Sequence, residues 1–179
     1  MRQTYMGSDE ALKRENIAAR TFTQSYNAML PEHTAAHFQA LKGFLGGIGE
    51  NSRIIAPFYC DRGNQIFIGK NSMLNYGATL LDMGKIIIGD NVRIAPNCSI
   101  YTVYHPLGYK ERANRVCYTE EVHIGDHTWI GGNVTILPGV HIGKRCVIGA
   151  CSLVTSDIPD DSLAYGSPCR VIRKLEENE

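Results

Sequence analysis

An unbroken six-residue repeat that begins at Val122 constrains this chain more than any other feature of its sequence. Read in sixes, the segment is VHIGDH, TWIGGN, VTILPG, VHIGKR, CVIGAC and SLVTSD. The third residue of each unit is a branched aliphatic: Ile124, Ile130, Ile136, Ile142, Ile148 and Val154. A period of six fits neither the roughly 3.6 residues of a helical turn nor the simple alternation of one strand. It predicts a repeated short strand and tight turn, in which each unit buries its apolar residue by stacking on its neighbours.

Charge and hydropathy argue against two classes of partner. The 18 basic residues balance the 18 acidic ones, so there is no electrostatic basis for binding nucleic acid or an anionic membrane. The longest apolar runs, such as Ile86–Ile88, are far too short to cross a bilayer. The N-terminal stretch MRQTYMGSDEALKRE has no apolar signal region, so we expect a cytoplasmic protein. The six cysteines form no CxxC pair, and we expect mostly buried free thiols.

The repeat divides the chain into three expected parts. Residues 1–53 are predicted to form an N-terminal helical cap, since SDE is typical of a helix start and Thr34 could cap a second helix. Residues 54–160 carry the solenoid. Residues 161–179 are expected to close it with a turn and a short strand or helix.

The six-residue step is interrupted twice. It runs through Ile68, Leu74 and Leu80, and again through Ile88, Ile94 and Ile100. Two extra residues separate these runs in LLDMGK, next to Asp82, and an interruption at a polar residue often marks a functional place. Residues 101–121 then lose the period, although Ile100 and Ile124 are four sixes apart. We therefore expect an excursion loop that leaves the coil and returns in phase, and such loops are usually functional.

Several stretches together resemble a known family. NYGATLLD, IAPNCSIYTVYHPLGYKER, HTWIGGNVTILPGVHIG, VIGACSLVTSDIP and GSPCRVIRKL are similar to the maltose and galactoside O-acetyltransferases of the hexapeptide-repeat acyltransferases. The resemblance covers nearly the whole chain in the same order. It implies an all-β solenoid, a left-handed parallel β-helix, with acetyl-CoA as co-substrate and no metal. It also implies a homotrimer whose active sites lie in grooves between neighbouring coils.

His105 is the candidate catalytic residue. Acetyl transfer from a thioester to a hydroxyl needs a base for the hydroxyl proton, and a neutral imidazole suits this near neutral pH. His105, in the YHPL sequence of the excursion loop, matches the family's catalytic histidine. The resemblance implies that it deprotonates an acceptor hydroxyl, which attacks the acetyl carbonyl directly. The alternative is a solvated loop histidine, and the other five histidines are expected at the surface.

The resemblance also assigns the binding residues. Asn75 and Asp61 match acceptor contacts, and Asp82 matches either an acceptor contact or a turn residue. The residues expected to bind coenzyme A are Trp129, Gly132, Ala150, Thr155, Ser156, Arg170 and Arg173. The N–H of Gly132 would stabilise the oxyanion, and the two arginines would contact phosphates. Ser156 replaces the family's usual lysine, which predicts weaker binding of coenzyme A unless Lys144 or Arg145 supplies the missing charge.

The acceptor is the open part of this prediction. Arg62 and Met83 depart from the family pattern on the acceptor side, so a sugar or a similar small hydroxylated molecule is expected without a choice between them. A non-sugar acceptor such as an antibiotic, a nucleotide sugar or serine is one alternative. A metal-dependent hydratase of the γ-carbonic-anhydrase type is another, because His105, His123 and His141 are spaced by one coil of 18 residues. A trimeric scaffold without catalysis is the third.

Overall fold

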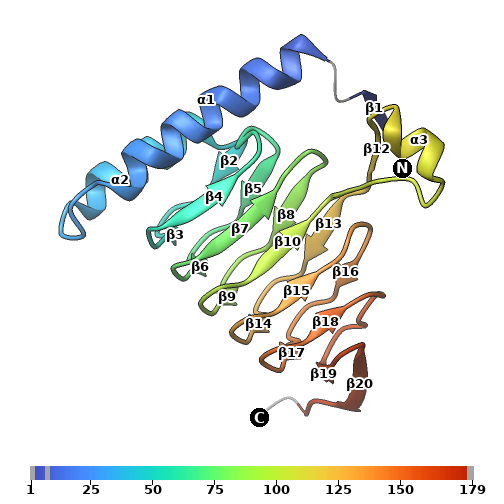
Figure 1. Ribbon diagram of the computed structural model, residues 1–179. Coiled ribbons are helices and arrows are strands. Elements are labelled where there is room, and N and C mark those ends of the chain that lie inside the picture. Colours follow the sequence, from blue (N-terminus) through green and yellow to red (C-terminus); the bar gives the residue numbers. More distant parts are fainter. Residues whose placement is uncertain (1–2, 7–8, 177–179) are drawn as a thin grey trace.

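The computed structural model describes residues 3–6 and 9–176, and its body is a left-handed parallel β-helix with three faces (Figure 1). The first face contains β2 (Gly47–Ile48), β5 (Ile66–Ile68), β8 (Ile86–Ile88), β13 (Val122–Ile124) and β16 (His141–Ile142). The second contains β3 (Arg53–Ile54), β6 (Met73–Leu74), β9 (Arg93–Ile94), β14 (Trp129–Ile130) and β17 (Val147–Ile148), followed by the closing strands β19 (Ser162–Gly166) and β20 (Cys169–Lys174). The third contains β4 (Phe58–Cys60), β7 (Ala78–Leu81), β10 (Ser99–Tyr101), β15 (Thr135–Ile136) and β18 (Leu153–Val154). The coil therefore begins at Gly47, before the expected boundary at residue 54.

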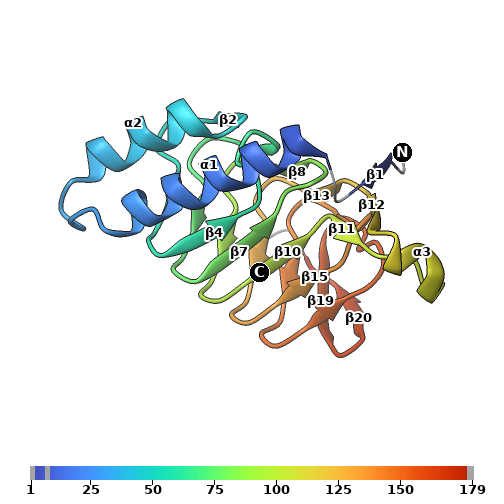
Figure 2. The same ribbon diagram turned by 45° about the horizontal axis from the view of Figure 1, so that its top comes forward.

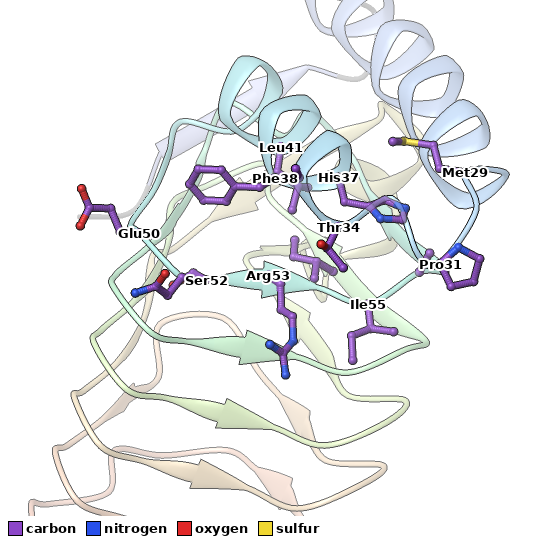
Figure 3. Close-up of a pocket in the computed structure, with 14 residues that line it drawn as sticks. Met29, Pro31, Thr34, His37, Phe38, Leu41, Glu50, Ser52, Arg53 and Ile55 are labelled. Atoms are coloured by element: carbon purple, nitrogen blue, oxygen red, sulfur yellow. The ribbon is translucent and has the colours of Figure 1, made fainter.

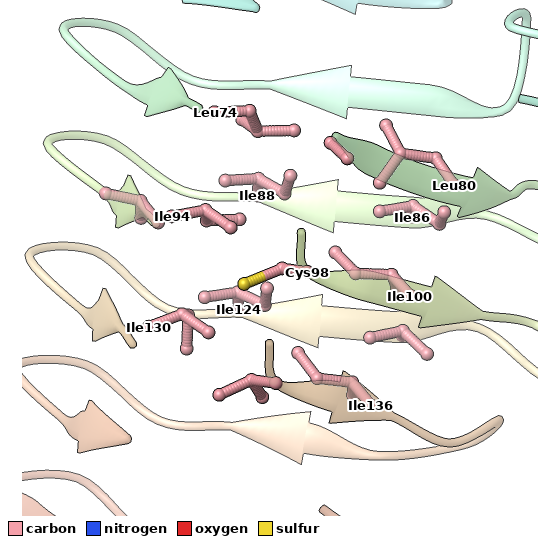
Figure 4. Close-up of a cluster of buried hydrophobic side chains, with 14 of the residues drawn as sticks. Leu74, Leu80, Ile86, Ile88, Ile94, Cys98, Ile100, Ile124, Ile130 and Ile136 are labelled. Carbon is pink, nitrogen blue, oxygen red and sulfur yellow. The ribbon is translucent and has the colours of Figure 1, made fainter. Parts of the chain in front are cut away.

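The predicted inward column is confirmed. The six branched aliphatics of the repeat are each at most 2 % exposed, and residues of earlier coils continue the same stacks inside the solenoid (Figure 4). The first residue of each unit is buried too: Val122, Thr128, Val134, Val140, Cys146 and Ser152. Each six-residue unit thus buries two side chains, and the turn between units keeps the next strand in phase.

The turns explain why the period is six. Each turn between the first and second faces contains a residue with positive φ between 55° and 61°, and asparagine is among the few residues that adopt this conformation readily. The residues at this position are Asn51, Asn71, Asn91, His127, Arg145 and Asp161. Serine and threonine side chains then satisfy turn backbone groups between coils, as when Ser72 Oγ donates to the Gly89 carbonyl at 2.8 Å and Thr128 Oγ1 to the Gly143 carbonyl at 2.8 Å.

Two helices cover the open end of the solenoid. Helix α1 (Glu10–Asn27) begins as predicted, with the Asp9 carboxylate accepting from the N–H of Ala11 at 2.8 Å. Helix α2 (Thr34–Phe44) has His33 rather than Thr34 at its N-cap, and no side-chain cap hydrogen bond is found there. Both helices lie against the first coil (Figures 1 and 2).

The helices also close the edges of the first coil. The Tyr26 hydroxyl donates to the Ile54 carbonyl at 2.6 Å, and the Asn27 amide bonds both backbone groups of Phe58, at 2.9 and 3.0 Å. An unpaired edge strand exposes N–H and C=O groups that invite aggregation. The helical cap therefore completes the hydrogen bonding of the first coil.

The excursion contains regular structure that sequence reasoning missed. It holds β11 (Val103–Tyr104), the short helix α3 (Tyr109–Ala113) and β12 (Val116–Thr119). Strand β1 (Gln3–Met6) pairs antiparallel with β12, so the N-terminal strand lies on the excursion rather than with the helical cap (Figure 2). Residues 7–8 and 177–179 lie outside the described residues.

Candidate active site

The candidate residues gather at two corners of the third face. We call the turns that precede its strands the leading corner: residues 55–57, 75–77, 95–98, 131–134 and 149–152. We call the turns that follow its strands the trailing corner: residues 61–65, 82–85, 102–121, 137–140 and 155–157. Asp61, Asp82 and His105 belong to the trailing corner, on three successive coils. The leading corner holds Asn75, Gly132 and Ala150.

His105 is exposed, and one hydrogen bond orients its ring. Its Nδ1 lies 3.1 Å from the carbonyl oxygen of Val116, at the start of β12. A carbonyl only accepts, so the neutral ring that makes this bond carries its proton on Nδ1. Nε2 is then left with its lone pair free, as a general base requires. A surface hollow beside the ring is lined by Tyr104, Pro106 and Tyr118 among others.

Asp82 sits at the slip in the repeat and is fully buried. Its Oδ1 accepts from the N–H groups of Asp61 at 3.0 Å and Arg62 at 2.8 Å, and its Oδ2 accepts from Gln65 at 3.3 Å. Burial raises the pKa of the Asp82 carboxyl, and the N–H donors act in the opposite direction. The side chain has no exposed surface to offer an acceptor, so in this conformation it holds the preceding turn in place.

Asp61 is partly buried in that turn. Burial and then the charge of Asp82 raise the pKa of its carboxyl, while Asn16 lowers it. Asn16, on α1, donates to the Asp61 carbonyl at 3.1 Å. Next to it, the Arg62 guanidinium pairs with Glu15 at 2.6 Å and donates to the Met83 carbonyl at 3.3 Å. Helix α1 thus contributes directly to the trailing corner, a contact that no periodic pattern predicts.

The leading corner presents free backbone donors. The N–H groups of Gly132 and Ala150 have no acceptor among residues 3–6 and 9–176, and they occupy the same turn position on successive coils. One coil before Gly132, this position is Pro96, which has no N–H. Asn75 lies on the same corner, with its Oδ1 accepting from the N–H of Tyr76 at 2.9 Å. Two vacant N–H groups in one column can polarise a carbonyl or hold an amide-bearing chain.

The remaining predicted residues lie along the coil toward the C-terminus. Trp129 is 55 % exposed on β14, directly beside the turn that holds Gly132. Thr155 and Ser156 are exposed at the trailing corner, and Arg170 and Arg173 are exposed on β20. The Arg170 guanidinium bonds only its neighbouring carbonyl, of Cys169, and has no carboxylate partner within the described ranges.

The candidate base and the candidate oxyanion donor lie at opposite corners of the third face. His105 follows β10 and β11, at the end of a third-face strand, whereas Gly132 precedes β15 at the beginning of the next strand of that face. The two corners of one chain therefore hold different parts of the predicted site.

The three histidines spaced by one coil do not come together within the described part of the chain. His123 and His141 are neighbours on the first face, with ring centroids 4.4 Å apart, and the His123 Nε2 is 3.3 Å from Glu121. His105 instead lies on the excursion. Over the part of the chain that the structure describes, no three histidine, cysteine or acidic side chains converge on a common point. In the same part, no helix is long and apolar enough to cross a membrane.

Comparison with known proteins supports the hexapeptide-repeat fold. Residues 121–156 match the family described as bacterial transferase hexapeptide (six repeats). The chain is 37 % identical over 170 residues to the galactoside O-acetyltransferase of Escherichia coli (strain K12), which covers 95 % of this chain and 84 % of the relative. A maltose O-acetyltransferase from Clostridium difficile 630 has a TM-score of 0.95 at 42 % identity, over 98 % of this chain and 94 % of that one. A galactoside acetyltransferase in complex with coenzyme A has a TM-score of 0.94 at 36 % identity, over 98 % and 88 % of the two chains. The chain belongs to the hexapeptide-repeat O-acetyltransferases.

In an O-acetyltransferase, three tasks must be performed: a hydroxyl is deprotonated, a carbonyl is polarised and a thioester is held. Among the described residues, His105 is the candidate for deprotonation and the Gly132 N–H is the candidate for polarising the carbonyl. The exposed residues near Ala150 are the candidates for holding the thioester. Sequence reasoning missed the partner that orients the base, the Val116 carbonyl. A backbone carbonyl carries no residue-specific signal, so only the fold could identify it.

Proposed function

We propose that the protein transfers an acetyl group from acetyl-CoA to a hydroxyl of a sugar or similar small acceptor, with His105 as the general base. The observation that carries the proposal is the 3.1 Å contact between His105 Nδ1 and the Val116 carbonyl. Because of this contact, Nε2 is the basic atom of the neutral ring, and one orientation of the ring is favoured. The resemblance of the chain to enzymes named maltose and galactoside O-acetyltransferases supports the same reaction.

The leading corner is proposed to hold the thioester. A relative of 36 % identity has been solved in complex with coenzyme A, and this chain has free N–H donors, an exposed Trp129 and an unpaired Arg170 along one end of the coil. The Ala150 N–H fits an amide of the pantetheine chain, and Arg170 and Arg173 fit the phosphates. Thr155 and Ser156 lie at the trailing corner, so they would contact the cofactor as hydroxyl donors from the copy whose trailing corner meets this leading corner.

The proposed step is a direct transfer. His105 Nε2 takes the proton of the acceptor hydroxyl while the hydroxyl oxygen forms a bond to the acetyl carbon. The N–H of Gly132 donates to the carbonyl oxygen as it becomes an oxyanion. The carbon–sulfur bond then breaks, the electron pair leaves on sulfur, and the proton held by His105 passes to the thiolate. Asn75 and Asp61 would orient the acceptor, and Asp82 would position Asp61 through its backbone.

We further infer a homotrimer in the cytoplasm. The separation of His105 from Gly132 across the third face means that the trailing corner of one copy must meet the leading corner of another. Closed rotational symmetry satisfies this requirement for every copy at once, and a trimer is the family's implied assembly. The cysteines are all free among the described residues, which fits a reducing compartment.

The test compares two histidine-to-asparagine variants. We expect His105→Asn to lower kcat with acetyl-CoA and a panel of sugars and alcohols by about a hundredfold or more, with thiol release as the measurement. His127→Asn is the control, because His127 is exposed at φ 61° and Asn91 holds the same turn position with φ 57°. Equal activities of the two variants would refute the role of His105.

A further inference from the structure

Two hollows adjoin the candidate site, one near each corner of the third face. The first lies under helix α2, has a volume of about 580 Å³ and is lined by residues such as Phe38 and Ile55 (Figure 3). His37, expected at the surface, lines it instead, with its Nε2 buried and unpaired within the described structure. Ile55 holds the same turn position as Asn75 one coil earlier, so this cavity belongs with the proposed acceptor contacts. The hollow at the trailing corner differs, because it contains the candidate base.

The strand that carries the base is held by a hydrogen bond outside its own backbone pairing. His105 directly follows β11, whose Tyr104 lies opposite Tyr118 of β12. The Tyr104 hydroxyl donates to the Glu120 carboxylate at 2.7 Å, and this bond is partly buried. A hydrogen bond to a charged acceptor is stronger than one between neutral groups, and partial burial strengthens it further. The residue next to the base is thus tied to a carboxylate that lies beyond the end of β12.

Glu120 is itself fixed to the coils. Its N–H donates to the Thr102 carbonyl at 2.9 Å. The buried Thr102 hydroxyl in turn donates to the Leu81 carbonyl at 2.6 Å and accepts from the N–H of Gly84 at 2.8 Å. The Glu120 carboxylate lies against Gly139 in the turn of the next coil, where a Cβ would collide with Oε2 and φ is 82°, a conformation that glycine adopts without strain. Two coils therefore hold Glu120, one through its backbone and one through its side chain.

We propose that Glu120 and Tyr104 are positioning residues for the base, His105. Their hydrogen bond fixes the path of β11, so that the imidazole ring reaches the Val116 carbonyl and carries its proton on Nδ1. This inference rests on the proposed function, since it concerns how the proposed base is held. The Val116 contact orients the ring within the excursion, and the bond to Glu120 orients the excursion relative to the coils. Such placement matters, because an error of about 1 Å can lower a rate by about a hundredfold.

The first experiment measures acetyl transfer by thiol release, with the same acceptors as for His105→Asn. Tyr104→Phe keeps the ring and removes the donor, and Glu120→Ala removes the acceptor. We expect each to lower kcat about tenfold with the KM for acetyl-CoA unchanged, because the proposed cofactor contacts lie elsewhere. The double variant should be no worse than either single one, since both remove the same bond. Glu120→Gln should keep kcat within about twofold of the wild type, because its amide oxygen still accepts the phenol proton.

Tyr109→Phe is the matched control. Tyr109 lies on α3 of the same excursion and is 70 % exposed, and the substitution removes the same hydroxyl, so kcat should equal that of the wild type.

The second experiment follows the His105 ring without turnover, by long-range ¹H–¹⁵N spectra of histidine-labelled protein at a pH where the ring is neutral. The signal is assigned by its loss in His105→Asn. The wild type should show the Nδ1–H tautomer. Tyr104→Phe and Glu120→Ala should show a mixture of both tautomers, because the Val116 bond no longer selects one, and Glu120→Gln should resemble the wild type.

The outcomes separate the two proposals. Wild-type kcat and ring spectra in Tyr104→Phe would overturn the inference, and this variant decides even if Glu120→Ala does not fold. Losses of kcat that multiply in the double variant, an equal loss in Tyr109→Phe, or a Glu120→Gln protein as slow as Glu120→Ala would also overturn it. If the ring spectra change as expected but the wild type acetylates no sugar or alcohol, the ring is held as inferred and the transfer proposal is what fails.

Discussion

The coils from residue 122 to 158 and the excursion from 102 to 121 differ in what their sequences specify. Every unit of the coils repeats one solution, with two buried side chains and one tight turn per six residues. The excursion buries little, and it carries the most exposed apolar side chain of the described chain, Leu107 at 98 %. Its order comes from β12, which pairs with β11 on one side and β1 on the other. The repeat thus builds a rigid frame, by which we mean the stacked coils. His105, the candidate base, lies instead in the excursion, which has no six-residue repeat.

The largest expected effect is a loss of stability caused by a substitution inside the coils. Ile130→Ala removes a side chain with no exposed surface from the central stack, and should lower the free energy of unfolding by about 2–5 kcal/mol. Leu107→Ala on the excursion should change it by less than about 0.5 kcal/mol. Urea denaturation of both variants at one protein concentration provides the measurement. Similar values for the two would mean that the regions do not differ as described.

The second prediction tests whether a backbone N–H of the coils, that of Gly132, takes part in the reaction. Gly132→Pro removes one N–H at a turn position that Pro96 already occupies one coil earlier, so we expect the fold to persist. Loss of an oxyanion donor should lower kcat by about a hundredfold. Gly132→Ala keeps the N–H, and its Cβ would meet only the Pro96 carbonyl at an ordinary 3.5 Å. If proline and alanine behave alike in thiol release, Gly132 supplies no hydrogen bond to the reaction.

The smallest effect concerns the slip in the repeat at Asp82. Its carboxyl has a raised pKa in the folded chain, mainly from burial, so the folded chain holds this proton more tightly than the unfolded chain. The stability contributed by Asp82 is fully present below the unfolded pKa and is lost as pH rises through the folded pKa. As pH rises through the folded-state pKa, the free energy of unfolding of the wild type should therefore fall relative to that of Asp82→Asn. Unfolding free energies of both proteins across pH 3 to 8 test this, and a constant difference would contradict it.

The frame could be predicted from sequence almost in full. The spacing of Ile124, Ile130 and Ile136 fixes which side chains point inward, because a shift of one residue would expose every one of them. The in-phase return after residue 121 was confirmed by the parallel pairing of β13 with β8. The handedness came from the resemblance alone, since right-handed crossovers are the general rule.

The candidate site was predictable only in part. His105, Asp61 and Asp82 were assigned from the resemblance, with no prediction of how they lie relative to one another, and the structure places them at one corner on successive coils. The pairing of β1 with β12, the reach of Asn16 to Asp61 and the burial of Asp82 depend on contacts between distant segments. No periodicity encodes such contacts. The roles of these residues in catalysis stay predictions that the variants above address.

The most direct test of the account is subunit complementation between two inactive variants. His105→Asn and Gly132→Pro chains, carrying different tags, are co-expressed, and the mixed assemblies are purified without selecting a subunit ratio. If each site takes its base from one chain and its oxyanion donor from the next, random mixing of equal amounts should restore about a quarter of the wild-type activity per site. Activity no higher than that of either variant alone would show that base and donor act within one chain, contradicting their separation across the third face.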